Sequence, residues 1–168
     1  MDCDLKIKYY PKASLGTDRI ANCVAAYTIY KKDCLVIDFG TAITYNAVSK
    51  QGVFQGGLIT CGIQGLYDIL PTHLKLLNKK TKGGNQNTLA LTTSQAVKSG
   101  LYYSVIGVIE KIKSDIQKNL NKKLYIIATG GGANFIPNLK HILNDVDVNL
   151  TLKGLAIIYQ RIIKGRNK

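Results

Sequence analysis

The spacing of hydrophobic residues changes from one stretch of the chain to the next, and this change separates predicted helices from predicted strands. In 17–32, TDRIANCVAAYTIYKK, apolar residues such as Ile20 and Val24 recur at helical spacing, and the two final lysines suit the carboxyl end of a helix dipole. Four further segments have helical spacing: 63–70, 73–80, 93–120 and 152–164.

The predicted helix at 93–120 is the longest and follows a polar run at 79–88, KKTKGGNQNT, which is typical of an exposed loop. Thr92 or Thr93 is a suitable N-cap, because a threonine hydroxyl accepts a hydrogen bond from a free N–H in the first turn. The residues of this helix that we expect to face the core are Ala96, Leu101, Val105, Val108 and Ile112.

Strand patterns occupy the stretches between these helices. CLVIDFG at 34–40 is an apolar run, AITYNAVS at 42–49 alternates with period two, and VFQGGLI at 53–59 resumes the pattern after a KQG turn. KLYIIAT at 123–129 is a second buried strand that runs into three glycines and then a helix, and a short strand near 146–150 is left open. The first dozen residues are expected to be extended or irregular. The order of elements is that of an α/β domain.

Length and composition fit one globular domain. The chain has 168 residues, 46% of them hydrophobic, which excludes a disordered or fibrous protein. Lysine and arginine number 23 against 10 acidic residues, so the net charge is +13 and attraction to polyanions is physically possible. Only three of these cations are arginines, the residue that base reading favours, so we expect a dispersed lysine surface and no nucleic-acid partner.

Cysteines and apolar runs indicate a cytoplasmic protein. No C-x-x-C pair and no histidine at zinc-ligand spacing accompanies the cysteines, which are predicted to be free thiols in a reducing compartment. They are Cys3, Cys23, Cys34 and Cys61. The first residues lack the apolar segment of a signal peptide, and the apolar runs fall short of the roughly 20 residues that cross a bilayer.

Two predicted strands end in polar turns that contain glycine, VIDFGTA at 36–42 and IATGGGA at 127–133. Glycine lets backbone N–H groups approach a ligand, and ligands of α/β sheets collect at the carboxyl ends of strands. Thr41 offers a hydroxyl and an amide to a phosphate, and Asp38 needs a cation or a hydrogen-bond donor if it is buried. The alternative is a tight turn in which Asp38 accepts backbone N–H groups. Neither turn matches a Walker A or G-x-G-x-x-G motif, and DFG lacks the other protein-kinase motifs.

The segment LGTDR at 15–19 is a third candidate. A helix that begins here would place the Asp18 carboxylate beside the N-terminal dipole and the Arg19 guanidinium within reach of an anionic substrate. Asp18 is then a plausible general base that orients a substrate hydroxyl. The alternative is an N-cap aspartate followed by a solvated arginine.

The remaining polar candidates carry less weight. His73 and His141 are expected to be surface residues, and Cys61 a small core residue rather than a nucleophile. Tyrosines are expected to serve packing, although one just before LGTDR can flank the same pocket. These tyrosines are Tyr9, Tyr10, Tyr102 and Tyr103.

The motifs occur together in one order. They are GTDR at 16–19, DFGTAIT at 38–44, GGLITCG at 56–62, TSQAVKSG at 93–100 and TGGGA at 129–133. This combination, from about Tyr9 to Tyr159, resembles the type III pantothenate kinase family. The resemblance implies a ribonuclease-H-like domain of the actin, hexokinase and sugar-kinase superfamily, with a mixed central sheet flanked by helices.

The resemblance also implies roles for individual residues. Asp18 matches the proton acceptor for the 4′-hydroxyl of pantothenate, Asp38 the ligand of a monovalent cation (potassium or ammonium), and Thr41 an ATP contact. The positions that match pantothenate-binding residues are Gly16, Thr17, Asp18, Arg19, Thr93 and Tyr9, or Tyr10 if the spacing before Pro11 slips by one. Members of the family use ATP with magnesium and are cytoplasmic homodimers that pair through the long helix region.

Two departures from the family pattern are visible. Cys61 replaces a proline, which removes no chemical group. The D-x-G-N-T phosphate loop of the family's first domain has no match, so 1–15 is expected to be a residual inter-domain segment and 16–168 the C-terminal domain of a duplicated fold. The alternatives to an active kinase are an inactive truncated product, a half completed by a separate first-domain chain, and a transcription-associated accessory factor of the same family. A missing domain would also expose an apolar face.

Overall fold

The structure, a computed structural model, describes residues 4–66, 87–135 and 139–166. The predicted helix at 63–70 is helical in its described part, 63–66. The rest of that helix, the helix at 73–80, most of the polar run at 79–88, and His73 lie outside the described residues.

A six-stranded mixed sheet forms the centre of the fold, with strand order β1-β4-β3-β2-β5-β6. Its strands are β1 (Lys6–Ile7), β2 (Cys34–Phe39), β3 (Ala42–Val48), β4 (Val53–Cys61), β5 (Tyr125–Thr129) and β6 (Asp145–Val146). β2, β3 and β4 form the predicted antiparallel meander, and β5 runs parallel to β2. The sequence left open whether a short strand forms near 146–150. The structure has this strand as β6, which begins slightly earlier than expected.

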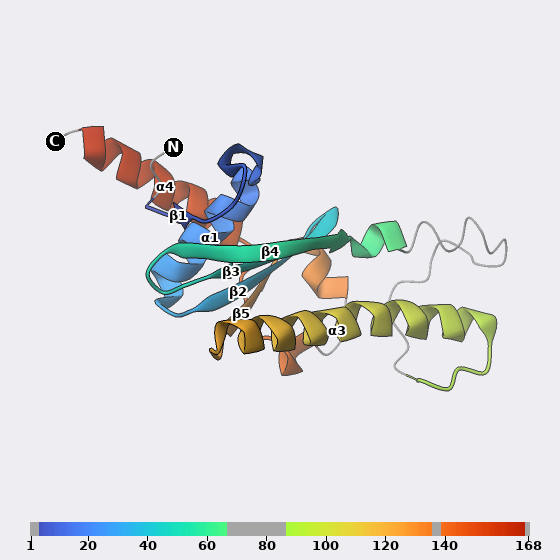
Figure 1. The fold of residues 1–168 in the computed structure, drawn as a ribbon. Coiled ribbons are helices and arrows are strands. Elements are labelled where there is room, and N and C mark those ends of the chain that lie inside the picture. Colours follow the sequence, from blue (N-terminus) through green and yellow to red (C-terminus); the bar gives the residue numbers. More distant parts are fainter. Residues whose placement is uncertain (1–3, 67–86, 136–138, 167–168) are drawn as a thin grey trace.

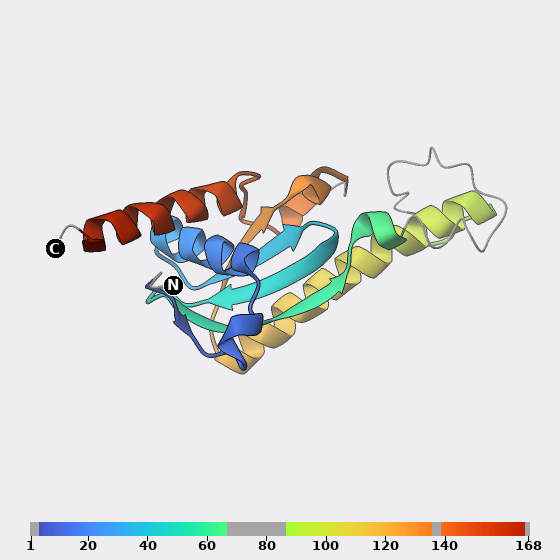
Figure 2. The same cartoon turned by 90° about the horizontal axis from the view of Figure 1, so that it is seen from above.

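Helices cover both faces of this sheet (Figures 1 and 2). They are α1 (Thr17–Tyr30), α3 (Thr93–Leu120) and α4 (Leu150–Arg166), with short 3-10 helices at Lys12–Ser14, Gly131–Phe135 and Leu139–His141. α1 and α4 lie side by side on one face, and α3 runs along the other. The mixed α/β architecture that the sequence predicts is confirmed.

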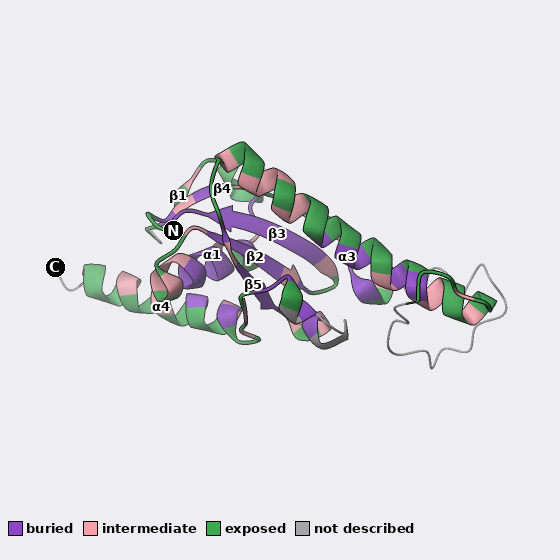
Figure 3. Ribbon diagram, turned by 90° about the horizontal axis from the view of Figure 1, so that it is seen from below, coloured by how far each residue is buried: buried purple, intermediate pink, exposed green. Residues whose placement is uncertain are grey.

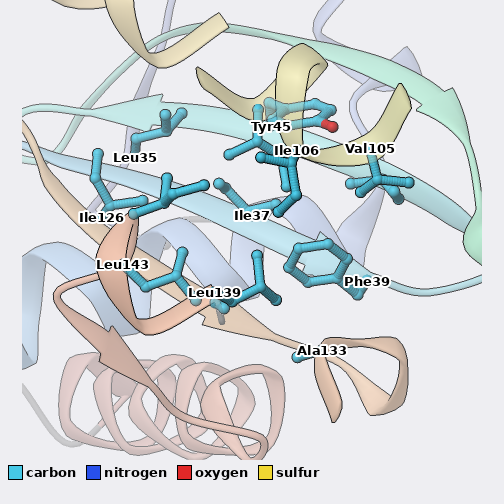
Figure 4. Packing of buried hydrophobic residues seen from close by; sticks show 14 of the residues in the cluster. Leu35, Ile37, Phe39, Tyr45, Val105, Ile106, Ile126, Ala133, Leu139 and Leu143 are labelled. Atoms are coloured by element: carbon cyan, nitrogen blue, oxygen red, sulfur yellow. The ribbon is translucent and has the colours of Figure 1, made fainter. Parts of the chain in front are cut away.

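Strand β2 divides the core between the two faces because successive side chains of a strand point in opposite directions. Leu35, Ile37 and Phe39 pack with α3 residues in one cluster (Figure 4). Cys34 and Val36 pack with α1 in the other. Asp38 continues this second series, so its side chain lies on the α1 face of the sheet, where the polar site described below is formed.

Helix α3 begins as the sequence predicts, with Thr92 as its N-cap accepting a hydrogen bond from the Gln95 amide at 3.3 Å. Leu101 and Val105 are buried as expected. Ala96 is exposed and Val108 is 39% exposed, so these two predictions are wrong. The buried stripe instead continues through Ile109, with Ile112, Ile116 and Leu120 packed against the core.

Three smaller expectations have mixed outcomes. His141 is exposed, as predicted. Cys61 is exposed, so the expectation of a core cysteine is wrong; it is the last residue of β4, paired with Ala42 at the end of the sheet. Within the described residues, no helix combines the length and apolar character that crossing a membrane requires.

Burial predicts which thiols react. Cys23 and Cys34 are buried free thiols, and burial raises the pKa of both, that of Cys34 to about 12. Because the thiolate is the nucleophile, we expect a thiol reagent at neutral pH to modify Cys61 in the folded protein at least ~10²-fold faster than either buried cysteine. Peptide mapping by mass spectrometry after timed labelling measures this. Fast labelling of Cys34 before unfolding would contradict the burial of β2.

Candidate active site

The polar site lies at the carboxyl ends of β2 and β5, on the face of the sheet covered by α1. Asp38 is in register with Thr129 on β5 and with Thr44 on β3. Side chains at paired positions point to the same face of a sheet. The two glycine-containing turns that the sequence singled out therefore meet at one edge, as ligand-binding turns of α/β proteins do.

The Asp38 carboxylate is half-buried and forms no ion pair with any residue of the described chain. Burial raises its pKa, the proximity of Asp18 raises it further, and a hydrogen bond from Asn22 lowers it. That bond runs from Asn22 Nδ2 to Asp38 Oδ2 at 2.8 Å. The alternative of a carboxylate satisfied by turn amides is not what the structure shows, because the partner is a side chain of α1.

Glycines bring the β5 turn against the end of β2. Gly130 has φ +85°, a conformation that favours glycine, and a Cβ there would lie 2.5 Å from Asp38 Oδ1. A Cβ at Gly132 would lie 2.8 Å from the Phe39 carbonyl oxygen. The turn is thus in direct contact with the Asp38 carboxylate, and side chains at these two positions would force it away.

Asp18 occupies the first turn of α1, and its side chain is exposed. The N-cap is Gly16, so the alternative in which Asp18 caps the helix is wrong. A Cβ on Gly16 would collide with Asp18 Oδ1, which means that the missing side chain makes room for the carboxylate. Asn22 lies one turn after Asp18 and therefore on the same side of α1. Asp18, Asn22 and Asp38 thus form one polar surface, in which Asn22 donates to Asp38 and Asp18 is close enough to raise the pKa of Asp38.

Arg19 is buried, with 4% of its surface exposed, so the alternative of a solvated arginine is wrong. Its Nε donates to Asn46 Oδ1 at 2.6 Å. The guanidinium carbon lies 5.5 Å from the ring centre of Tyr9 and 5.6 Å from that of Phe54, which are cation–π distances. Within the described residues the guanidinium has no carboxylate partner. The residue that follows Asp18 in α1 is therefore a buried cation that points into the Tyr9, Phe54 and Asn46 cluster.

The adjacent residues Tyr9 and Tyr10 have different surroundings in the structure. Tyr9 packs edge-on against Phe54, with ring centres 5.8 Å apart, and so belongs to the Arg19 cluster. Tyr10 is 96% exposed. Of the two, Tyr9 is the one that accompanies the GTDR segment.

Thr41 and Thr93 occupy different places. Thr41 is exposed in the turn after β2, next to Gly62, where a Cβ would lie 2.8 Å from the Gly40 carbonyl oxygen. Thr93 is the first residue of α3 and is exposed. Figure 1 shows that end of α3 projecting away from α1, so within one chain the structure does not bring Thr93 to the Asp18 and Asp38 region. Thr41 follows Asp38 by three residues, in the turn between β2 and β3.

Sequence reasoning missed three polar residues of the site. Asn22 is fully buried and links Asp38 to Thr151 of α4, whose hydroxyl donates to Asn22 Oδ1 at 2.7 Å. Asn46 holds Arg19 and donates to Thr44 Oγ1 at 2.8 Å. Thr129 is fully buried, and its hydroxyl oxygen finds no hydrogen-bond partner in the described chain. Position in the sequence could have identified two of them. Asn22 follows Asp18 by four residues, which places both on one side of a helix, and Thr129 is the first residue of the TGGGA turn.

This arrangement offers two kinds of binding chemistry. The Asp38 carboxylate, the Phe39 carbonyl and the Thr129 hydroxyl are oxygen ligands, the type preferred by hard cations. The glycine turns and the first turn of α1 present backbone N–H groups, which favour anions. Asp18 is the exposed carboxylate beside them.

Comparison with known proteins identifies the fold. A solved structure described as a conserved putative Baf family transcriptional activator from Campylobacter jejuni has a TM-score of 0.66 and 25% identity, over 96% of this chain and 71% of that one. An activator of 2-hydroxyisocaproyl-CoA dehydratase from Clostridium difficile, solved with ADPNP, has a TM-score of 0.53 at 11% identity, over 90% and 69% of the two chains. The fold is that of the actin-like ATPases, as the resemblance implied.

Sequence relatives identify the family. A curated type III pantothenate kinase from Bifidobacterium longum subsp. infantis is 34% identical over 160 residues, 95% of this chain and 63% of the relative. One from Desulfatibacillum aliphaticivorans is 34% identical over 163 residues, 96% of this chain and 63% of the relative. The chain thus spans less than two thirds of the length of these relatives. Because the family profile described as type III pantothenate kinase also matches residues 1–115, this chain belongs to the type III pantothenate kinase family.

Proposed function

We propose that this chain is the pantothenate-binding lobe of a type III pantothenate kinase. Completed by the part of the family fold that it does not span, it would transfer the γ-phosphate of ATP to pantothenate and form 4′-phosphopantothenate, the first step of coenzyme A biosynthesis. The observation that carries this proposal is the convergence of Asp18, at the start of α1, and Asp38, at the end of β2, on one polar surface bounded by glycine turns.

In this reaction Asp18 accepts the proton of the 4′-hydroxyl while the hydroxyl oxygen bonds to the γ-phosphorus of ATP. The bond from that phosphorus to the bridging oxygen breaks, and ADP leaves with the electron pair. The exposed carboxylate, free of any ion pair in the described chain, suits a group that must reach a substrate. Because phosphoryl transfer depends mainly on positioning and charge, orienting the hydroxyl is the main task of this residue.

The pantothenate site would be built from the GTDR segment. Gly16 and Thr17 present backbone next to Asp18, and the buried Arg19 contributes positive charge toward the anionic substrate while Tyr9 closes its other side. Thr93 stands at the distant end of α3. Its proposed contact with pantothenate therefore requires a second subunit or a rearrangement of α3, and the family's homodimer supplies the simpler explanation.

The cation and nucleotide would bind at the strand ends. Asp38 fits a monovalent cation such as potassium or ammonium, since its half-buried carboxylate lacks an ionic partner in the described chain and has other oxygen ligands beside it. A bound cation would offset the charge of the phosphates. Thr41, in the exposed turn after β2, is the proposed ATP contact. Magnesium would arrive with ATP; the described residues hold no group of three acidic, histidine or cysteine side chains that suits a metal.

The domain assignment and setting are part of the proposal. Residues 16–168 would form the C-terminal ribonuclease-H-like domain and 1–15 an inter-domain segment. The free thiols Cys23 and Cys34 are in keeping with a reducing cytoplasm.

The test is a kinase assay on the purified chain, alone and mixed with the part of the Bifidobacterium longum relative that lies outside the matched 63%. We expect 4′-phosphopantothenate, detected by mass spectrometry, only in the mixture, with ATP and pantothenate both present and with more product in potassium than in sodium. We expect the chain alone to be slower by orders of magnitude, because it spans only 63% of the relative and any phosphate donors outside that part would be absent from the reaction mixture. A complex that forms but makes no product would contradict the proposed reaction.

A second candidate function rests on the solved relative described as a putative transcriptional activator. A chain with net charge +13 that acted in this way would bind duplex DNA with an affinity that falls steeply with salt. Such binding, in a protein without kinase activity in the completed form, would favour this function over the first.

A further inference from the structure

The side of helix α4 that packs on α1 carries a threonine next to the candidate active site. The two helices lie close together, because a Cβ at Gly154 would collide with the Ala21 carbonyl oxygen. Figure 3 shows that the buried turns of α4 are those beside α1. Thr151 precedes Gly154 by three residues and therefore lies on the same side of α4. The close approach brings its hydroxyl to Asn22, the residue after Ala21, where it donates to Asn22 Oδ1 at 2.7 Å.

The side-chain amide of Asn22 is held at both of its ends. Asn22 is fully buried, and its Nδ2 donates to Asp38 Oδ2 at 2.8 Å. Its Oδ1 accepts from Thr151 and from no other residue that the structure describes. Because a carboxylate only accepts hydrogen bonds, the amide must turn its NH₂ group toward Asp38. The Thr151 hydroxyl supplies the donor that the buried amide oxygen then needs, so the two contacts together fix one orientation of the amide.

This arrangement leaves one oxygen of the Asp38 carboxylate available. Asp38 Oδ2 is occupied by Asn22, whereas Asp38 Oδ1 accepts no hydrogen bond from a described residue. A Cβ at Gly130 would lie 2.5 Å from Asp38 Oδ1 and 2.8 Å from the Phe39 carbonyl oxygen, so the missing side chain leaves a space between two oxygen ligands. The unpartnered hydroxyl of Thr129 is in register with Asp38 on the neighbouring strand. Asp38 Oδ1 is therefore the carboxylate oxygen that faces the proposed cation site.

We propose that Asn22 and Thr151 are positioning residues of the type III pantothenate kinase reaction, which hold the Asp38 carboxylate with its Oδ1 toward the monovalent cation. Asn22 acts on Asp38 directly, and Thr151 acts through Asn22. This inference rests on the proposed function for the identity of the cation. Removing a group that orients a metal ligand typically weakens metal binding about 10- to 100-fold. Thr151 is one hydrogen bond further from the cation than Asn22, so its removal should have the smaller effect.

The first measurement is the potassium concentration that gives half-maximal activity, at constant ionic strength. It uses the chain mixed with the unmatched part of the Bifidobacterium longum relative. We expect Thr151→Val to raise this concentration about three- to tenfold and Asn22→Leu about 10- to 100-fold. The kcat at saturating potassium should stay nearly unchanged in Thr151→Val, because that residue touches no reacting atom. Thr151→Ser keeps the hydroxyl and should retain the value of the unmodified chain.

The matched control is Thr28→Val on α1. Thr28 Oγ1 accepts from Arg161 Nη2 of α4 at 3.0 Å, so Thr28 also joins the two helices, nearer the carboxyl end of α1 and away from Asp38. Thr28→Val and Thr151→Val each remove one hydrogen bond between α1 and α4, and both should lower the melting temperature in sodium chloride by similar amounts. Only Thr151→Val should change the potassium concentration for half-maximal activity.

The second measurement needs no catalysis. It is the melting temperature of the chain alone in potassium chloride, compared with that in sodium chloride at the same ionic strength. A cation that binds the folded chain raises its melting temperature, so potassium should stabilise the unmodified chain and Thr28→Val more than sodium does. Thr151→Val should lose most of this difference, and Thr151→Ser should keep it.

Three outcomes would overturn the proposal. They are an equal change of the potassium response in Thr28→Val, a Thr151→Val variant that responds like the unmodified chain, and the absence of any difference between potassium and sodium in both measurements. If the mixture makes no phosphopantothenate, the melting comparison decides. A potassium effect that Thr151→Val loses and Thr28→Val keeps would then support the positioning role and contradict only the proposed reaction.

Discussion

Asp18→Asn is expected to lower the rate of pantothenate phosphorylation by the completed protein about 10²- to 10⁴-fold, the usual range for removing a general base. An amide keeps the size of the carboxylate but cannot accept the hydroxyl proton. Because Asp18 is exposed and forms no ion pair within the described chain, the substitution should leave the melting temperature nearly unchanged. The measurement is kcat and KM at saturating ATP, with the loss expected in kcat.

The matched control for this experiment is Asp115→Asn on α3. Asp115 is a partly exposed aspartate, paired with Lys111 at 2.8 Å in an i, i+4 ion pair of small energetic value. It should leave kcat unchanged. Equal activity of the Asp18 and Asp115 variants would remove the general-base role from Asp18, even if the family reaction itself is observed.

Local patterns were sufficient to predict most of the fold. The apolar run of β2 reflects burial on both faces of the sheet, and the apolar spacing of α1 reflects burial of one side of a helix; the sequence records both directly. Where burial depends on distant elements, the prediction failed. Val108 has helical spacing with Val105, yet the sheet covers the side of α3 that carries Ile109, and nothing in the helix itself fixes that rotation.

The residues of the candidate site were likewise predictable where the signal is local and were missed where it depends on distant elements. Asp38 and the glycine turns were predictable because a polar residue at the end of an apolar strand is rare and the turn chemistry is local. The burial of Arg19 was not, because a guanidinium is buried only when distant residues surround it, here Tyr9, Phe54 and Asn46. Asn22 was missed because an asparagine inside a helix acquires its role only from the strand that the helix packs against.

The Arg19 and Asn46 pair should contribute the largest single polar term to the stability of the α1 face. In Asn46→Leu, the buried Arg19 Nε loses its acceptor at 2.6 Å, and we expect the free energy of unfolding to fall by about 2–4 kcal/mol. Arg19→Met removes the charge itself and leaves only the neutral Asn46 oxygen without its donor. Its expected loss is about 1–3 kcal/mol. Urea denaturation followed by circular dichroism measures both.

The double variant Arg19→Met with Asn46→Leu separates this interaction from the packing around it. With neither polar partner present, neither member of the Arg19 and Asn46 pair is left unpaired. Thr44 Oγ1 loses its donor in the double variant and in Asn46→Leu alike, so that cost cancels in the comparison. The loss should therefore be smaller than the sum of the two single losses by about 1–3 kcal/mol. Asn46→Asp serves as the conservative control, because it keeps an oxygen at the position that Arg19 contacts, and it should retain most of the stability that Asn46→Leu loses. Strict additivity of the two single variants would mean that the guanidinium is stabilised by the Tyr9 and Phe54 rings alone, and that Asn46 serves Thr44 instead.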